Sequence, residues 1–166
     1  MTALLLISFL IFVSYNGIIA SVFGVPDSLS DSFYNIRKHN GGMLFTLFCW
    51  ATAFPLLIFW IDLLDYDWNF LPFIACVGLM FVGTAPAFKD HELERKVHIW
   101  SALICISASY LWSMLYGSIF ITISFIIISG LLFFVLRKCK IYWVEMVAFI
   151  NIYIQLLIWK LYFISF

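Results

Sequence analysis

The chain has 166 residues, of which 65% are hydrophobic and only 11% are charged, whereas a soluble domain is about half apolar and a quarter charged. The mean hydropathy of +1.08 excludes a soluble fold, because a chain of this length cannot bury so much apolar surface. The net charge of zero argues against a nucleic-acid partner, and the sequence holds no Walker, dinucleotide-binding or zinc-ribbon motif.

Six segments of the chain have the length that a helix needs to cross the hydrocarbon core of a membrane, about 20 predominantly apolar residues. The first of them lacks the basic start of a signal peptide, and its apolar run is too long for the usual signal-peptide core. We therefore interpret it as a transmembrane helix. The six predicted helices cover residues 2–23, 41–64, 70–88, 97–116, 118–136 and 144–165.

The predicted fold class is all-α, a polytopic transmembrane bundle of six helices that forms a single integral membrane domain over residues 1–166. The division between the fourth and fifth helices rests on Tyr116-Gly117-Ser118, a minimal hairpin without charge. An undivided segment of about 40 residues would be too long for one crossing, so the chain is expected to turn there. No loop is long enough to fold alone.

The basic residues set the predicted orientation of the bundle. Eight of the nine lie in the first, third and fifth gaps between the apolar segments, and cytoplasmic loops carry an excess of Lys and Arg. We expect these loops in the cytoplasm and both termini on the non-cytoplasmic side. The tight loops and the missing signal peptide favour a bacterial inner membrane. The eight residues are Arg37, Lys38, Lys89, Arg95, Lys96, Arg137, Lys138 and Lys140.

The first loop contains three serines and two aspartates within residues 27–32. Such side chains cap helices and build turns, which predicts a short interfacial helix begun by Ser28 or Ser30. The alternative is functional, because the same hydroxyls and carboxylates would form a rim over a pocket on the cytoplasmic side. The composition alone does not decide between the two.

The third loop indicates the start of a helix. Asp90 can cap it, and acidic residues in the following turn complement the positive end of the helix. Glu94 and His98 lie one turn apart on one face and could share a metal or a proton. The favoured interpretation is a solvated, ion-paired helix end, so we predict no metal site and no cofactor.

His98 stands where the fourth predicted helix enters the membrane, and it begins a stripe of side chains that recur at helical spacing. Small polar residues on a transmembrane helix usually mark contact with another helix. The alternative is that the stripe forms one wall of a polar cavity. Its members are His98, Ser101, Cys105, Ser109, Trp112 and Tyr116.

Polar side chains inside apolar segments are costly in a membrane and therefore mark candidate functional residues. Most of them fall in the cytoplasmic half, which a water-filled cavity open to the cytoplasm would explain. The residues predicted to line it are Asn16, Thr84, His98, Ser101, Asn151 and Gln155. Histidine suits general acid–base catalysis at neutral pH, so the candidate catalytic residues of an enzyme would be His98, Asp90, Glu145 and Ser30.

The segment Val97-His98-x-x-x-Ala102 and the serine-rich first loop resemble small six-helix membrane proteins of the Frag/DRAM/Sfk type and, more distantly, the alkaline ceramidase and progestin-receptor superfamily. The resemblance implies lipid-directed chemistry within the bilayer. Ceramidase-like members hold zinc with three histidines near a serine and an aspartate. This chain has three histidines but no His-x-x-x-His pair on a late helix, so the resemblance carries over only a role for His98 at the cytoplasmic rim.

Three functions are consistent with these features. The first is a pore, channel or small transporter, including a membrane effector, and the second is an intramembrane lipid-binding protein or lipid hydrolase. The third is a scaffold for a membrane protein partner. We favour the first, with the lipid bilayer as partner, a homo-oligomer or a membrane protein as a further partner, no nucleic acid, and action that is not enzymatic.

Overall fold

The computed structural model describes residues 2–63 and 70–164, which are entirely α-helical apart from turns and connections. Within these residues seven helices follow one another and no strand occurs. Six are long, and one short helix lies in the first loop. They are α1 (Thr2–Phe23), α2 (Ser32–Arg37), α3 (Met43–Asp62), α4 (Phe70–Thr84), α5 (Glu92–Leu115), α6 (Ile119–Val135) and α7 (Lys140–Ile164).

The long helices lie where the six apolar segments are, but some ends differ from the prediction. Helix α4 stops at Thr84, four residues before the predicted end, because Pro86 has no backbone N–H to continue the helix. Helix α5 begins at Glu92 rather than at residue 97, since the acidic first turn is stable as helix outside the apolar segment. The predicted turn is present, with α5 ending at Leu115 and α6 beginning at Ile119.

Among the described residues, four helices are long and apolar enough to cross a membrane. They are Thr2–Phe23, Met43–Asp62, Glu92–Leu115 and Lys140–Leu161. Helices α4 and α6 are equally apolar, but they have 15 and 17 residues. At 1.5 Å of rise per residue their lengths are about 22 and 25 Å, somewhat less than the roughly 30 Å of a hydrocarbon core.

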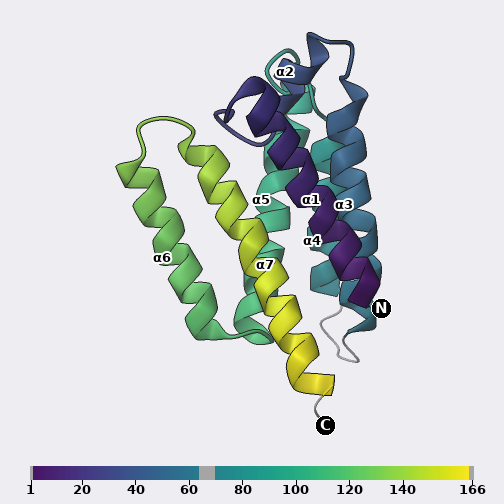
Figure 1. The fold of residues 1–166 in the computed structure, drawn as a ribbon, viewed down its shortest axis with the longest axis vertical. Helices are drawn as coiled ribbons and strands as arrows, with labels where there is room; N and C mark the ends of the chain where they lie inside the picture. The colour runs from purple at the N-terminus through teal and green to yellow at the C-terminus, as the bar shows by residue number, and fades with distance from the viewer. Residues whose placement is uncertain (1, 64–69, 165–166) are drawn as a thin grey trace.

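The long helices run alternately up and down (Figure 1). Helix α1 begins and α7 ends at one end of the bundle, whereas α2 and the connections over residues 85–91 and 136–139 lie at the other (Figure 1). Helices α1, α3, α4 and α5 pack in that order, and α6 packs mainly against α7 at one side. Eight of the nine basic residues therefore belong to the end opposite the termini, which we call the basic end.

Aromatic rings fill the space between the first helices and α7. Phe12 stacks on Phe149 of α7 at a centroid distance of 4.6 Å, and Tyr15 stacks on Phe48 of α3 at 4.0 Å. Ring burial on this scale contributes strongly to packing, and the stacked geometry adds about 0.5–1.5 kcal/mol per pair. The aromatic core holds α1 between α3 and α7.

Helix α4 lies close to α3 because Gly83 has no side chain. A Cβ atom at Gly83 would lie 2.6 Å from the Cβ atom of Cys49. The close approach also allows the hydroxyl of Thr46 to donate a hydrogen bond to the carbonyl oxygen of Gly83, at 2.7 Å. Small residues permit such contacts between membrane helices.

Gly83→Ala should therefore separate α3 from α4 and lower the free energy of unfolding by about 1–3 kcal/mol, the usual cost of overpacking. Gly17→Ala is the matched control, because a Cβ atom there meets nothing within 4 Å and alanine is the better helix former. Thermal unfolding of both variants in detergent measures the difference. Equal stability of the two variants would contradict the close α3–α4 contact.

Candidate functional site

The first loop is bound to the beginning of α7 by two hydrogen bonds. The backbone N–H of Leu29 donates to Oε2 of Glu145 at 2.6 Å, and the N–H of Tyr142 donates to the carbonyl oxygen of Asp27 at 3.0 Å. The first of these bonds joins residues 116 positions apart in the sequence. Glu145 thus fixes the backbone of the loop one residue before Ser30.

His98 joins the first loop to the end of α4. Its Nδ1 atom lies 2.9 Å from the carbonyl oxygen of Ala85, and its Nε2 atom lies 2.9 Å from Oγ of Ser30. A carbonyl oxygen can only accept, so Nδ1 carries the hydrogen, and Nε2 of the neutral ring accepts the hydroxyl hydrogen of Ser30. The ring also stacks on Phe88, with centroids 4.4 Å apart.

The end of α4 supplies the acceptor for this arrangement. Helix termini leave carbonyl groups without helical partners, and Pro86 prevents the helix from continuing past Thr84. Side chains of other helices satisfy two of these groups, because Thr46 donates to Gly83 and His98 donates to Ala85. The early end of α4 therefore determines the orientation of the His98 ring.

A pocket of about 660 Å³, here called the rim pocket, lies at the basic end between α5, the start of α7 and the first and third loops. Its polar lining residues are Ser28, Ser30, Lys89, Arg95, His98 and Glu145, and its apolar ones are Phe88, Ile99, Ala102, Leu103, Ile106 and Ile141. Four of the apolar residues descend along α5 from the level of His98. The pocket is thus polar at its loop end and apolar along the helix below, which is the polarity of an amphiphile.

The charges at the rim are unevenly paired. Lys89 forms an ion pair with Asp31 at 2.5 Å. Arg95 is exposed and makes no ion pair with the carboxylates of the described residues. Asp90, a predicted catalytic residue, pairs instead with Arg37 at 2.5 Å and does not line the rim pocket. The structure therefore brings Ser30, His98 and Glu145 to one pocket, and Asp90 lies outside it.

Glu94 and His98, the candidate metal ligands, have other partners. Oε2 of Glu94 accepts the backbone N–H of Ala87 at 2.9 Å, and both ring nitrogens of His98 are hydrogen-bonded. No group of three or more His, Cys, Asp or Glu residues placed to hold a metal ion occurs in the described part of the chain. Glu94 stabilises the third loop next to the rim pocket.

Of the six residues predicted to line a cavity, His98 lines the rim pocket and the other five lie elsewhere. Asn16 donates to the carbonyl oxygen of Phe12 and accepts from the hydroxyl of Tyr142. Thr84 is exposed and hydrogen-bonded within its own helix. Ser101 packs on α4, where its carbonyl oxygen would lie 3.0 Å from a Cβ atom at Gly78.

The two amide residues of α7 have different environments. Gln155 joins α7 to α6, because it accepts the N–H of Ser118 at 2.8 Å and donates to the hydroxyl of Thr122 at 2.9 Å. Asn151 is fully buried, and neither of its side-chain polar atoms has a hydrogen-bond partner among the described residues. Neither residue lines the rim pocket.

Lys89 and Arg95 are the functional candidates that the sequence did not single out. The sequence did contain a signal for Arg95, because Arg95 lies three residues before His98 and therefore on the same face of the helix. No side-chain pattern in the sequence indicated that the Ala85 carbonyl would accept a hydrogen bond from His98. This contact depends on where α4 ends.

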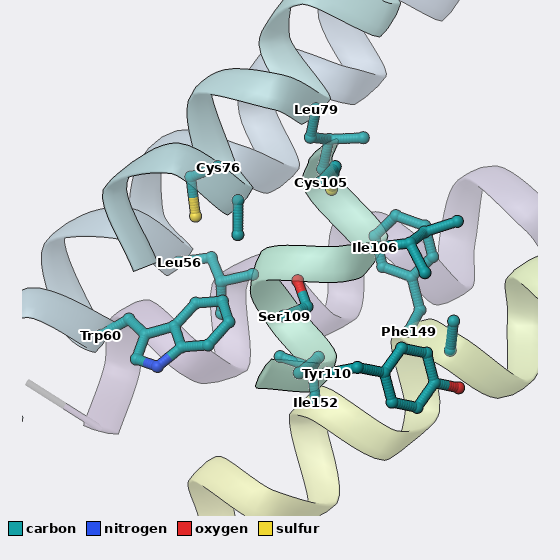
Figure 2. A pocket seen from close by; sticks show the side chains of 12 residues that line it. Leu56, Trp60, Cys76, Leu79, Cys105, Ile106, Ser109, Tyr110, Phe149 and Ile152 are labelled. Atoms are coloured by element: carbon teal, nitrogen blue, oxygen red, sulfur yellow. The ribbon is translucent and has the colours of Figure 1, made fainter. Parts of the chain in front are cut away.

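Buried polar side chains such as Ser8, Thr52 and Gln155 occur within the bundle, but the small cavity there has an apolar lining. This cavity of about 50 Å³ lies between α3, α4, α5 and α7. Figure 2 shows that carbon and sulfur atoms predominate around it, with Cys76 and Trp60 on one side and Ile106 and Phe149 on the other. An apolar cavity of this kind holds water poorly.

His98→Ala should lower the free energy of unfolding by about 1–3 kcal/mol, because the Ala85 carbonyl and the buried Ser30 hydroxyl both lose their partner. His39 is exposed, and its ring nitrogen lies 3.3 Å from the Asn35 carbonyl. His39→Ala should change stability by less than about 0.5 kcal/mol. Thermal unfolding in detergent measures both variants, and equal effects would refute the joining role of His98.

No protein-family model, curated protein or solved structure matches the chain. The functional assignment therefore depends on the geometry of the rim pocket.

Proposed function

We propose that the protein crosses a membrane six times with its basic end in the cytoplasm, and that the rim pocket binds an anionic amphiphile from the inner leaflet. The alternating direction of the six long helices and the gathering of basic loops at one end support this orientation (Figure 1). A bilayer adapts to the shorter α4 and α6 by local thinning at modest cost.

The rim pocket has a polar end and an apolar wall, and this division supports the binding proposal. Arg95 and Lys89 stand at the polar end, where an anionic headgroup would form charge-assisted hydrogen bonds. Ile99 and Leu103 remain about half exposed on α5, at 48% and 51%. An acyl chain lying along them would cover apolar surface while its headgroup stays at the level of the loops.

Binding accounts for the geometry better than a pore does. The rim pocket opens at the basic end, whereas the cavity deeper in the bundle is small and apolar. Conduction would need polar groups or water along the whole path. The volume of the rim pocket also falls within the range of ordinary ligand pockets, about 300–1,000 Å³.

Arg95→Gln should weaken the retention of an anionic lipid about tenfold, the effect of losing one hydrogen bond to a charged group. Lys96→Gln is the matched control, because Lys96 is the next residue, pairs with Glu92 at the surface and does not line the rim pocket. Native mass spectrometry of the protein titrated with phosphatidylglycerol and, separately, phosphatidylcholine measures retention.

We expect the wild-type protein and Lys96→Gln to retain phosphatidylglycerol in preference to phosphatidylcholine, and Arg95→Gln to lose this preference. Equal retention of both lipids by the wild-type protein would refute the anionic pocket. Equal losses in the two variants would indicate a general surface-charge effect and would also contradict the proposal.

A further inference from the structure

The hydroxyl of Ser30 has the surroundings of a nucleophile. It lies on the wall of the rim pocket, and its hydrogen-bond partner in the structure is Nε2 of His98, at 2.9 Å. The distance falls within the range for proton transfer between a hydroxyl and a general base. Ser28 lines the same pocket, but its hydroxyl accepts the backbone N–H of Asp31 instead.

The base of this pair is itself oriented by a third group. Nδ1 of His98 donates to the carbonyl oxygen of Ala85, so the lone pair of the neutral ring is on Nε2 and points at Ser30. A serine, a histidine and a hydrogen-bond acceptor behind the histidine are the arrangement that activates serine nucleophiles, on whatever fold they occur. In this chain a backbone carbonyl takes the place of the usual carboxylate.

The backbone around Ser30 is fixed on both sides. The N–H of Leu29 donates to Glu145, and the carbonyl oxygen of Ser30 accepts the N–H of Phe33 at 3.2 Å. Such support holds a nucleophile close to its productive position. Glu145 acts here as a positioning residue, through the backbone of Leu29.

We propose that Ser30 and His98 cleave a carboxylic ester of the amphiphile in the rim pocket, an activity that rests on the proposed lipid binding. Oγ of Ser30 forms a bond to the carbonyl carbon while Nε2 of His98 takes the hydroxyl proton. The ester C–O bond then breaks, and His98 gives the proton to the leaving alcohol. Water attacks the acyl-serine, again deprotonated by His98, which releases the fatty acid and returns a proton to Ser30.

The pocket accounts for the choice of substrate class. In a glycerophospholipid the ester groups lie directly below the headgroup, at the boundary between polar and apolar regions. Ser30 and His98 occupy that boundary in the rim pocket, with Arg95 on the same α5 face and Ile99 and Ala102 on the next turn. An ester bound with its headgroup at Arg95 and its acyl chain along α5 therefore meets Ser30.

A fluorophosphonate probe tests the nucleophile on the full-length protein in phosphatidylglycerol nanodiscs. We expect one phosphonyl adduct on the wild-type protein, assigned to Ser30 and not to Ser28 by tandem mass spectrometry. Ser30→Ala should lose the adduct, and His98→Gln should slow its formation strongly. Ser21→Ala is the control that keeps it, because Ser21 is exposed on α1 and donates to its own helix.

A second readout separates this proposal from the binding proposal. The wild-type protein should retain both phosphatidylglycerol and its diether analogue in native mass spectrometry, and it should form lysolipid and free fatty acid only from the ester-linked lipid. If the wild-type protein retains the lipid but forms neither an adduct nor lysolipid, the proposal that Ser30 is a nucleophile is overturned and the binding proposal stands. Wild-type protein that does not retain the lipid overturns the binding proposal as well.

Discussion

Two hydrogen bonds on one imidazole ring connect the parts of the basic end. The ring of His98 is bonded to Ala85 after α4 and to Ser30 in the first loop, which are segments far apart in the sequence. In an apolar bundle a polar group without a partner is expensive, so this buried ring holds the loop against the helices. The rim pocket has its shape because the loop stays there.

The cost of a polar group without a partner also explains why polar contacts differ between the bundle interior and the basic end. Within the bundle, hydroxyl and amide side chains donate mainly to backbone carbonyls or to groups on neighbouring helices, as Ser8 does to Thr52 at 2.8 Å and Gln155 does to Thr122. The ion pairs of the described residues lie at the basic end, where Arg37 meets Asp90 and Lys89 meets Asp31. The charged side chains therefore lie where the proposed orientation places the membrane surface.

The sequence predicted the positions of the long helices well, because long uninterrupted apolar runs can be read directly from the order of the residues. It also named Ser30, His98 and Glu145, with Asp90, as candidate catalytic residues, and the first three line one pocket. Asp90, the fourth candidate, instead pairs with Arg37, a contact across 53 residues that the sequence did not indicate. The sequence also could not predict which neighbours Asn151 and Gln155 contact, because a helix that is apolar almost all round gives no indication of which face packs inward.

The Ala85 contact shows a further limit of sequence reasoning. Pro86 indicates that α4 is disturbed, but the identity of the carbonyl that becomes available depends on the exact last turn, which ends at Thr84. Helix ends are the least certain part of any assignment made from sequence. A one-residue shift would aim a different carbonyl at His98, and the arrangement of Ser30 and His98 depends on that choice.

The ¹⁵N NMR spectrum of labelled His98 tests both hydrogen bonds of this ring, because it reports which ring nitrogen carries the hydrogen. In neutral lipid bilayers we expect the neutral tautomer with the hydrogen on Nδ1, and a shift of the Nε2 resonance in Ser30→Ala with little change at Nδ1. A hydrogen on Nε2 of the neutral ring, or an Nε2 resonance that does not respond to Ser30→Ala, would show that His98 does not join Ala85 to Ser30.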